Sequence, residues 1–223
     1  MTFQFNYPNG SPADRGWGPG WPNCQTDKAV SLVVDGVPFP GGIREELREL
    51  AERLVRESLR RGYLPSLDNP GCWGGGCRPT KDSSGNLTDN PSNHSWYTAL
   101  DVNAPHNVYG SSPHQIPQAM ADLWRQYGWR WLGPPIRDWM HFDFAGSPAD
   151  AREMLNKARA ASLGEETDVT GDELLEGIVA FNQGGPEPVD GPALKVYRAL
   201  TVAANSHAAA PAHDHPHTHL VPG

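Results

Sequence analysis

Two short segments of this sequence contain residues of the types that commonly bind metal ions in proteins. The first, S-N-H-S-W-Y-T-A-L-D-V-N at 92–103, contains His94 and Asp101, and the second, D-W-M-H-F-D-F at 138–144, contains His141. Catalytic zinc sites use three protein ligands, drawn mainly from imidazole nitrogens and carboxylate oxygens, and leave a fourth position open for water. These three side chains are therefore a candidate zinc site.

Both segments alternate between apolar and polar side chains, which predicts strands at 95–103 and 138–145. In each strand the apolar side chains share one face, and Asp101 or His141 lies on the opposite face. If the two strands are neighbours, Asp101 and His141 converge. An exposed sheet edge shows the same alternation, so the pattern alone leaves a purely structural role open.

Zinc-assisted hydrolysis also needs a carboxylate that takes a proton from the attacking water and passes it to the leaving amine. Asp138 lies three residues before His141, an offset that would direct it to the other face of a regular strand. We therefore expect Asp138 in the turn P-P-I-R-D that precedes the strand, where the backbone can direct it toward the metal.

Taken together, the two segments resemble the zinc peptidases of the D-alanyl-D-alanine carboxypeptidase and L-alanyl-D-glutamate endopeptidase family, which have the hedgehog/DD-peptidase fold. The phage-lysin branch has the pattern H-S-W-G-x-A-x-D-[IV]-N followed by D-x-M-H-F-E. This chain has H-S-W-Y-T-A-L-D-V-N and D-W-M-H-F-D, and the likeness spans about residues 40–146. The resemblance implies an α+β fold in which a small antiparallel sheet carries a zinc site and helices flank the sheet.

Residue by residue, the resemblance implies zinc bound by His94, Asp101 and His141, with Asp138 as general base and then general acid. It also implies that Arg78, in the loop G-C-R-P-T, holds the substrate carbonyl and stabilises the oxyanion. An arginine suits this task because it stays charged and donates several hydrogen bonds.

Further candidate positions lie beside the ligands in sequence. Ser92 matches the family's serine before the first histidine, and we expect it to contact the substrate or a ligand. Tyr97 replaces the family's glycine, so we expect a changed substrate fit or loop geometry, and Trp139 is a candidate substrate contact. Asp143 stands where glutamate is commoner, and it is either a partner of a zinc histidine or a solvated strand residue.

The reaction that the resemblance implies is zinc-dependent hydrolysis of peptide bonds in the stem peptides of bacterial peptidoglycan. The likeness to phage lysins favours the bond between L-Ala and D-Glu, and a D,D-carboxypeptidase or D,D-endopeptidase activity is the alternative within the family. A non-catalytic, zinc-stabilised module that binds the cell wall or serves in a phage tail is the alternative of another class. Because every expected ligand and the base are present, we expect an active enzyme.

The first residues lack the basic and apolar regions of a signal peptide. We therefore expect a phage-encoded enzyme that is made in the host cytoplasm and acts on the wall after release, or one that is carried by the virion. The formal net charge of −8 argues against a protein built to bind nucleic acid. No apolar run is long enough to span a membrane.

Helices must hold these segments in place, and three are expected, at 44–61, 117–128 and 147–163. The first carries an apolar stripe at helical spacing and ends at Gly62, the residue type that most often terminates a helix. The stretch 64–93 is rich in Gly, Pro, Asn and Asp and is expected to be a long loop.

Charge and composition divide the chain. Residues 1–164 carry 16 Lys and Arg against 17 Asp and Glu, whereas residues 165–206 carry 2 against 8. We therefore predict a zinc peptidase domain at 1–164 and an acidic helical appendage or linker at 165–206. Residues 207–223 are predicted to be a disordered tail rich in His, Pro and Ala.

The sequence has three cysteines, at positions 24, 72 and 77. Cys72 and Cys77 lie close together in G-C-W-G-G-G-C and could close a small disulfide loop, which would leave Cys24 unpaired. Three unlinked thiols are the alternative.

Overall fold

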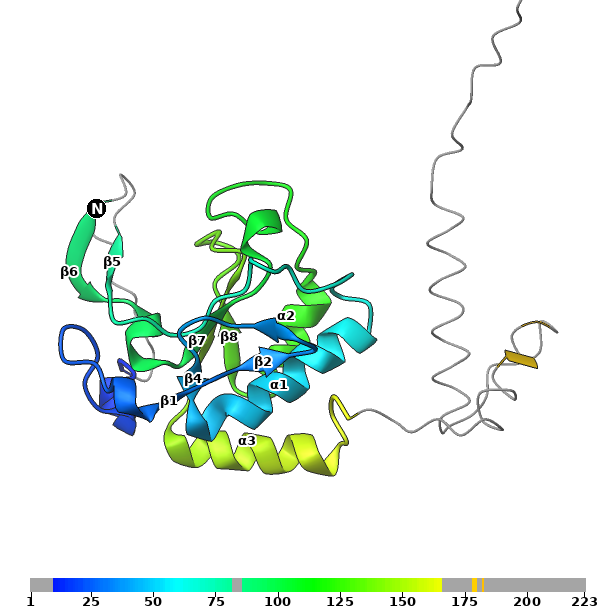
Figure 1. The fold of residues 1–223 in the computed structure, drawn as a ribbon, viewed down its shortest axis with the longest axis horizontal. Helices are drawn as coiled ribbons and strands as arrows, with labels where there is room; N and C mark the ends of the chain where they lie inside the picture. Colours follow the sequence, from blue (N-terminus) through cyan, green and yellow to red (C-terminus); the bar gives the residue numbers. More distant parts are fainter. Residues whose placement is uncertain (1–9, 82–85, 166–177, 180–181, 183–223) are drawn as a thin grey trace, which may run out of the picture. The chain divides into compact units, whose positions relative to one another are not determined.

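The central sheet has three antiparallel strands in the order β7-β9-β8, formed by β7 (Ala99–Asp101), β9 (His141–Phe144) and β8 (Trp129–Trp131). Figure 1 shows the sheet in the computed structural model with helices packed around it. The register places Asp101 directly opposite His141, so these two predicted ligands are neighbours across the strands. The prediction of an α+β protein with a small antiparallel sheet is confirmed.

The structure describes residues 10–81, 86–165, 178, 179 and 182. The chain divides into two units, Met1–Glu165 and Glu166–Gly223, and all the elements named here lie in the first. The predicted appendage and tail therefore lie almost entirely outside the described residues. Within the described part of the chain, no helix is both long and apolar enough to cross a membrane.

Three α-helices surround the sheet: α1 (Glu45–Arg60), α2 (Gln118–Arg125) and α3 (Pro148–Ala160). The apolar stripe of α1 is buried, as its spacing predicts, except for the half-buried Leu59, and Gly62 follows the helix with a φ of 68°. Helix α3 begins with a capping box, in which Ser147 and Asp150 each bond the backbone N–H of the other. All three predicted helices are present, with shorter bounds.

Short strand pairs, single helical turns and irregular loops make up the rest of the described chain. Strands β2 (Val33–Val34) and β3 (Val37–Pro38) form one hairpin, and β5 (Pro79–Lys81) and β6 (Leu87–Pro91) form another. Strands β1 (Ala29–Val30) and β4 (Ile43–Arg44), which flank the first hairpin in sequence, pair with each other. The helical turns are η1 (Ala13–Trp17), η2 (Thr26–Lys28), η3 (Asn93–Trp96) and η4 (Ala104–His106). The predicted loop at 64–93 thus ends in the β5–β6 hairpin.

Aromatic side chains fill the space between α2 and one face of the sheet. The ring of Trp124 on α2 lies 4.3 Å from that of Phe142 and 5.3 Å from that of Trp129, measured between centroids. The indole N–H of Trp124 donates to the hydroxyl of Ser58 on α1, over 2.9 Å. This packing covers the apolar face of the sheet, and the ligands lie on the other face.

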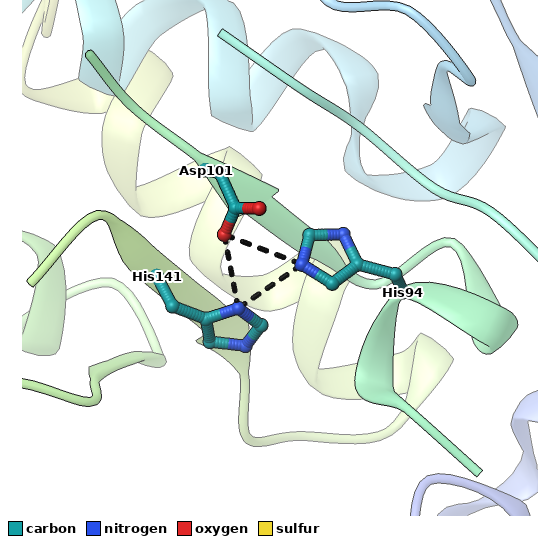
Figure 2. Close-up of side chains that lie close together, drawn as sticks. All are labelled: His94, Asp101 and His141. Carbon is teal, nitrogen blue, oxygen red and sulfur yellow. Dashed lines mark hydrogen bonds and ion pairs between the residues drawn. The ribbon is translucent and has the colours of Figure 1, made fainter. Parts of the chain in front are cut away.

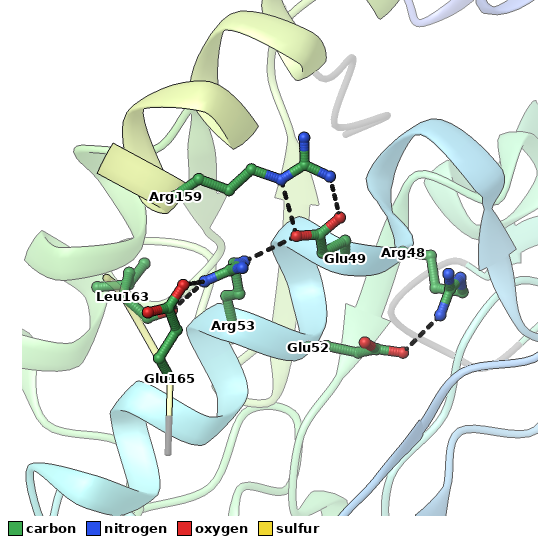
Figure 3. A network of polar contacts seen from close by, with 7 residues as sticks. All are labelled: Arg48, Glu49, Glu52, Arg53, Arg159, Leu163 and Glu165. Carbon is green, nitrogen blue, oxygen red and sulfur yellow. Dashed lines mark hydrogen bonds and ion pairs between the residues drawn. The ribbon is translucent and has the colours of Figure 1, made fainter. Parts of the chain in front are cut away.

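Charged side chains join α1 to α3 and to the residues that follow α3 (Figure 3). Glu49 of α1 accepts hydrogen bonds from Arg53 over 3.0 Å and from Arg159 of α3 over 2.9 Å. Arg53 also donates to the Leu163 carbonyl and to Glu165. The network fixes α3 along α1.

Both predicted strands are shorter than their patterns indicated. The first is confined to Ala99–Asp101, because residues 93–96 form the helical turn η3, which Ser92 caps with its side chain. The second begins at His141, since residues 138–140 lie in a turn. Alternation over 95–98 and 138–140 therefore did not reflect strand geometry.

Both alternatives for the cysteines, a bond between Cys72 and Cys77 and three unlinked thiols, are wrong. Cys24 and Cys77 form a disulfide across a sequence separation of 53, and Cys72 is a buried free thiol. Cys72 lies in the core and Cys77 on the surface, so the short spacing between them did not bring their side chains together. The bond links the N-terminal segment to the loop that precedes β5.

Candidate metal centre

Three side chains from three elements converge on one point (Figure 2): His94 from η3, Asp101 from β7 and His141 from β9. His94 Nε2 lies 3.1 Å from His141 Nδ1 and 3.3 Å from Asp101 Oδ1, and His141 Nδ1 lies 3.1 Å from the same oxygen. The predicted ligand set is thus assembled in the structure.

The triangle of donor atoms fits a tetrahedral metal. Ligand atoms at about 2.0–2.2 Å from zinc in a tetrahedron lie about 3.3–3.6 Å apart. The three observed separations of 3.1–3.3 Å are within a few tenths of an ångström of that range. A cation placed over this triangle has three protein ligands and a fourth position open.

The orientation of His94 is fixed by one contact to its backbone and one to its ring. The Ser92 side chain accepts a hydrogen bond from the His94 backbone N–H and so caps η3. The ring atom Nδ1 lies 2.6 Å from the Gly74 carbonyl oxygen, to which it donates, so Nε2 keeps its lone pair for a metal. This backbone contact selects the tautomer that a ligand needs.

A close approach of two glycine segments places the Gly74 carbonyl. The N–H of Gly74 donates to the carbonyl of Pro40 over 2.8 Å, and the N–H of Gly75 donates to the carbonyl of Gly42 over 2.6 Å. A methyl group at Gly74 would overlap the Gly42 carbonyl oxygen. The run G-G-G between Trp73 and Cys77 therefore serves backbone packing that orients His94.

Charge and burial act together on the two strand ligands. Burial alone would raise the pKa of Asp101, but His94 and His141, when they are protonated, lower it well below its ordinary value through their charge and hydrogen bonds. Burial would lower the pKa of His141, but the hydrogen bond and the charge of Asp101 raise it. Asp101 is therefore ionised, as a metal ligand must be.

Asp138 lies in the turn before β9, as expected. Its backbone N–H donates to Leu132 and its carbonyl accepts from the N–H of His141, which ties the turn to the strand. Burial is the main cause that raises the pKa of the Asp138 carboxyl, and the charges of His141, His94 and Arg78 oppose it. A carboxyl with a raised pKa is suited to accept and return a proton.

Arg78 lies at the surface, directly before β5 and directly after the disulfide residue Cys77. Its carbonyl accepts a hydrogen bond from the N–H of Ser92 over 3.1 Å. The charge of its side chain lowers the pKa of Asp138, so the guanidinium acts on that carboxyl. The disulfide thus anchors the segment that holds Arg78.

Asp143 is buried, so its interpretation as a solvated strand residue is wrong. Its carboxylate accepts two hydrogen bonds from the Arg130 guanidinium, at 2.9 and 2.5 Å, and one from the side-chain amide of Asn93. Asn93 directly precedes His94, and Asp143 lies two residues after His141. The carboxylate therefore connects the elements that carry the two histidines.

Tyr97 has a φ of 60°, a left-handed conformation that favours glycine, which explains why the resembled motif has glycine there. Its ring packs against Gly75. Trp139 is nearly buried: its ring stacks on that of His114 at 3.9 Å, and its N–H donates to Ser111. Trp139 thus lies in a packed aromatic cluster beside the turn that holds Asp138.

Sequence reasoning missed three supports of the site. These are the Gly74 carbonyl, the bond from Asn93 to Asp143, and the disulfide next to Arg78. The glycine run was visible in the sequence. A contact made by a backbone carbonyl, however, cannot be predicted from residue types, because every residue has one. The partner of Asp143 likewise depends on which strands lie side by side.

Residues 86–144 match the family model described as D-alanyl-D-alanine carboxypeptidase. The matched segment contains all three ligand candidates and Asp138, whereas Arg78 precedes it. No curated protein and no solved structure matches the chain. Residues 86–144 are thus similar to this peptidase family, and they contain the candidate metal site of His94, Asp101 and His141.

Proposed function

We propose that this protein is a zinc-dependent peptidase that hydrolyses the stem peptides of bacterial peptidoglycan. The observation that carries the proposal is the convergence of His94, Asp101 and His141, with His94 held in the tautomer that leaves Nε2 free. A site with two imidazole ligands and one carboxylate suits zinc. The family match adds the expectation of peptide hydrolysis.

When bound, zinc supplies a Lewis acid that polarises the scissile carbonyl and lowers the pKa of water in the fourth position. The chain's own residues do the rest. Asp138 accepts the proton of the attacking water and then donates it to the leaving amine. The raised pKa of Asp138 supports this role, because a carboxyl that holds its proton more firmly can return it to the amine.

Arg78 faces the negative charge that develops on the carbonyl oxygen. Its guanidinium stays charged and can donate two hydrogen bonds to one oxygen. Its charge acts on Asp138, so both groups share one electrostatic environment. The disulfide at Cys77 limits how far this exposed loop can move.

For the scissile bond we propose the link between L-Ala and D-Glu. The support is the likeness of H-S-W-Y-T-A-L-D-V-N and D-W-M-H-F-D to the phage-lysin motifs. Such an enzyme acts on the wall after release from the host cell or as part of a virion. The description of the matched family favours a second candidate, a D,D-carboxypeptidase or D,D-endopeptidase.

A non-catalytic module that binds the wall or serves in a phage tail needs the metal ligands. It does not need the Asp138 carboxyl or the Arg78 guanidinium. Asp138 is partly buried with a raised pKa, and Arg78 acts on it from a loop that a disulfide anchors. A partly buried carboxyl with a raised pKa costs stability, and a binding module does not need one. This arrangement supports the enzyme over the module.

The test is mass spectrometry of purified peptidoglycan after digestion, with and without a chelator. We expect new L-Ala C-termini and D-Glu N-termini that disappear on chelation and return with zinc. Release of free D-Ala or of opened cross-links would move the proposal to the second candidate. No new termini with any metal, or full activity of Asp138→Ala, would contradict the mechanism.

A further inference from the structure

Trp73 differs from the other tryptophans of this chain in its exposure. All eight tryptophans lie in the described residues, and seven of them are buried or half-buried. Trp73 is 45 % exposed. It follows the buried Cys72 and precedes the glycine run that orients His94.

The backbone of Trp73 is held firmly, although its side chain is exposed. Its N–H donates to the Asp101 carbonyl and its own carbonyl accepts from the Asp101 N–H, each over 2.9 Å. These two bonds form an antiparallel bridge at the outer edge of β7. Gly76, three residues later, donates to the His94 carbonyl. No loop ordering is therefore needed when a ligand meets the indole.

The bridge also decides where the indole lies. Directly opposed residues of an antiparallel pair have their side chains on one face, with Cβ atoms about 4.5–5.5 Å apart. Asp101 is opposed to Trp73 on one side and to His141 on the other. The three side chains therefore form a row on the face where the ligands converge (Figure 2 shows Asp101 and His141). Trp73 is the outer, exposed end of that row.

We infer that Trp73 is a specificity-determining residue whose indole packs against a C–H-rich, apolar face of the substrate next to the scissile bond. Single exposed aromatic side chains are common, but this one stands on a firmly held backbone and adjoins the candidate metal ligand Asp101 on the same face. A rigid aromatic ring provides a large contact area at a small entropic cost. The inference rests on the proposed peptidase function, and it assigns Trp73 to substrate binding without a role in proton transfer.

Two parts of the wall substrate present such a face: the sugar ring of the glycan strand and the alanine side chains of the stem peptide. The experiment compares wild-type protein with Trp73→Ala and Trp73→Phe, all zinc-loaded, on a disaccharide-linked stem peptide and on the same peptide without sugars. Val33→Ala is the matched control, because Val33 is also 45 % exposed and lies on the separate β2–β3 hairpin.

We expect Trp73→Ala to raise KM about fivefold or more, the factor expected for one lost aromatic contact. The value of kcat and the zinc content should stay near wild type, and Trp73→Phe should recover most of the loss. The dissociation constant should rise by the same factor when it is measured with Asp138→Asn added to every variant to stop turnover. An effect confined to the disaccharide substrate identifies the sugar as the partner, and an equal effect on both identifies the peptide.

Unchanged KM and dissociation constant in Trp73→Ala, beside an active wild type, would overturn the inference and leave the peptidase proposal standing. A loss of zinc or of kcat with an unchanged dissociation constant would also overturn it, since Trp73 would then support the fold of the metal site. A wild-type protein that neither cleaves nor binds either substrate would overturn both proposals.

Discussion

The Nδ1 atom of His94 lies 2.6 Å from the Gly74 carbonyl oxygen, so one nitrogen of the ring is bound to the backbone and the other faces Asp101 and His141. A histidine that donates to a carbonyl in this way is held as a fixed tautomer in a fixed orientation. The affinity of the site for metal thus depends on where two glycine segments meet, at a distance from the ligands in sequence.

Gly74→Ala is expected to weaken zinc binding about 10- to 100-fold, the usual cost of losing a group that orients a ligand. The added methyl group would overlap the Gly42 carbonyl and displace the Gly74 carbonyl. Gly76→Ala is the control, because a methyl group there meets nothing within 4 Å. Competition with a zinc chelator measures both affinities. Equal affinities in the two variants would contradict this role of Gly74.

Asp143→Ala is expected to destabilise the fold by about 2–4 kcal/mol and to weaken zinc binding. The change removes a buried carboxylate that accepts hydrogen bonds from Arg130 and Asn93. Denaturant unfolding measures the loss. Asp122→Ala, which breaks an exposed ion pair with Arg125, should stay within about 0.5 kcal/mol of wild type. Similar losses in both variants would show that burial of the Asp143 pair is unimportant.

Removal of the disulfide by Cys24→Ser together with Cys77→Ser is expected to cost about 2–4 kcal/mol, because the bond closes a long loop. Activity should also fall, since Arg78 follows Cys77 and gains freedom. A reductant should lower the thermal midpoint of the wild type and leave that of the double variant unchanged. A wild-type midpoint that does not respond to reductant would contradict the pairing.

The lowered pKa of Glu49 predicts that the free energy of unfolding depends on pH. Its hydrogen bond with Arg159 is the main cause that lowers the pKa of its carboxyl to about 2 from the usual 4.5. A lowered pKa in the fold means that the stabilisation is complete above about pH 4.5 and is lost as the pH falls toward 2. Because solvent screens this partly exposed carboxylate, we expect its interactions to stabilise the fold by about 1 kcal/mol.

The free energy of unfolding of Glu49→Gln should therefore lie below that of wild type at pH 7, and the two should approach each other as the pH falls toward 2. Glu52→Gln is the control, because the ion pair of Glu52 with Arg48 lies within α1. An equal difference between wild type and Glu49→Gln at pH 7 and pH 3 would contradict the assignment.

The sequence was enough to predict the features that rest on side-chain type and local spacing. The apolar stripe and Gly62 predicted α1, and the paired motifs predicted the ligands His94, Asp101 and His141. Asp138 was expected in a turn because a strand would have directed it away, and it lies in one. The helix depends on periodicity and a terminator that act within a few residues, and the ligands were expected from the residue types and the resemblance of the two motifs to a known family.

Features that depend on distant contacts could not be predicted in this way. Residues 93–96 form a helical turn because Ser92 caps it and Tyr97 adopts a left-handed conformation, neither of which alternation reveals. The partner of Cys77 is 53 residues away, so a search for nearby cysteines selected the wrong one. The carboxylate of Asp143 meets Asn93 only after the sheet has formed.

The central claim is that His94, Asp101 and His141 hold zinc, and anomalous diffraction at the zinc edge from crystals of the full chain tests it most directly. Residues 207–219 contain five histidines, a residue type that commonly binds metals, so a zinc count alone does not locate the ion. We predict a strong peak about 2.0–2.1 Å from His94 Nε2 and His141 Nδ1, and about 2.0–2.2 Å from Asp101. A zinc-containing crystal with no peak among these three side chains would contradict the account.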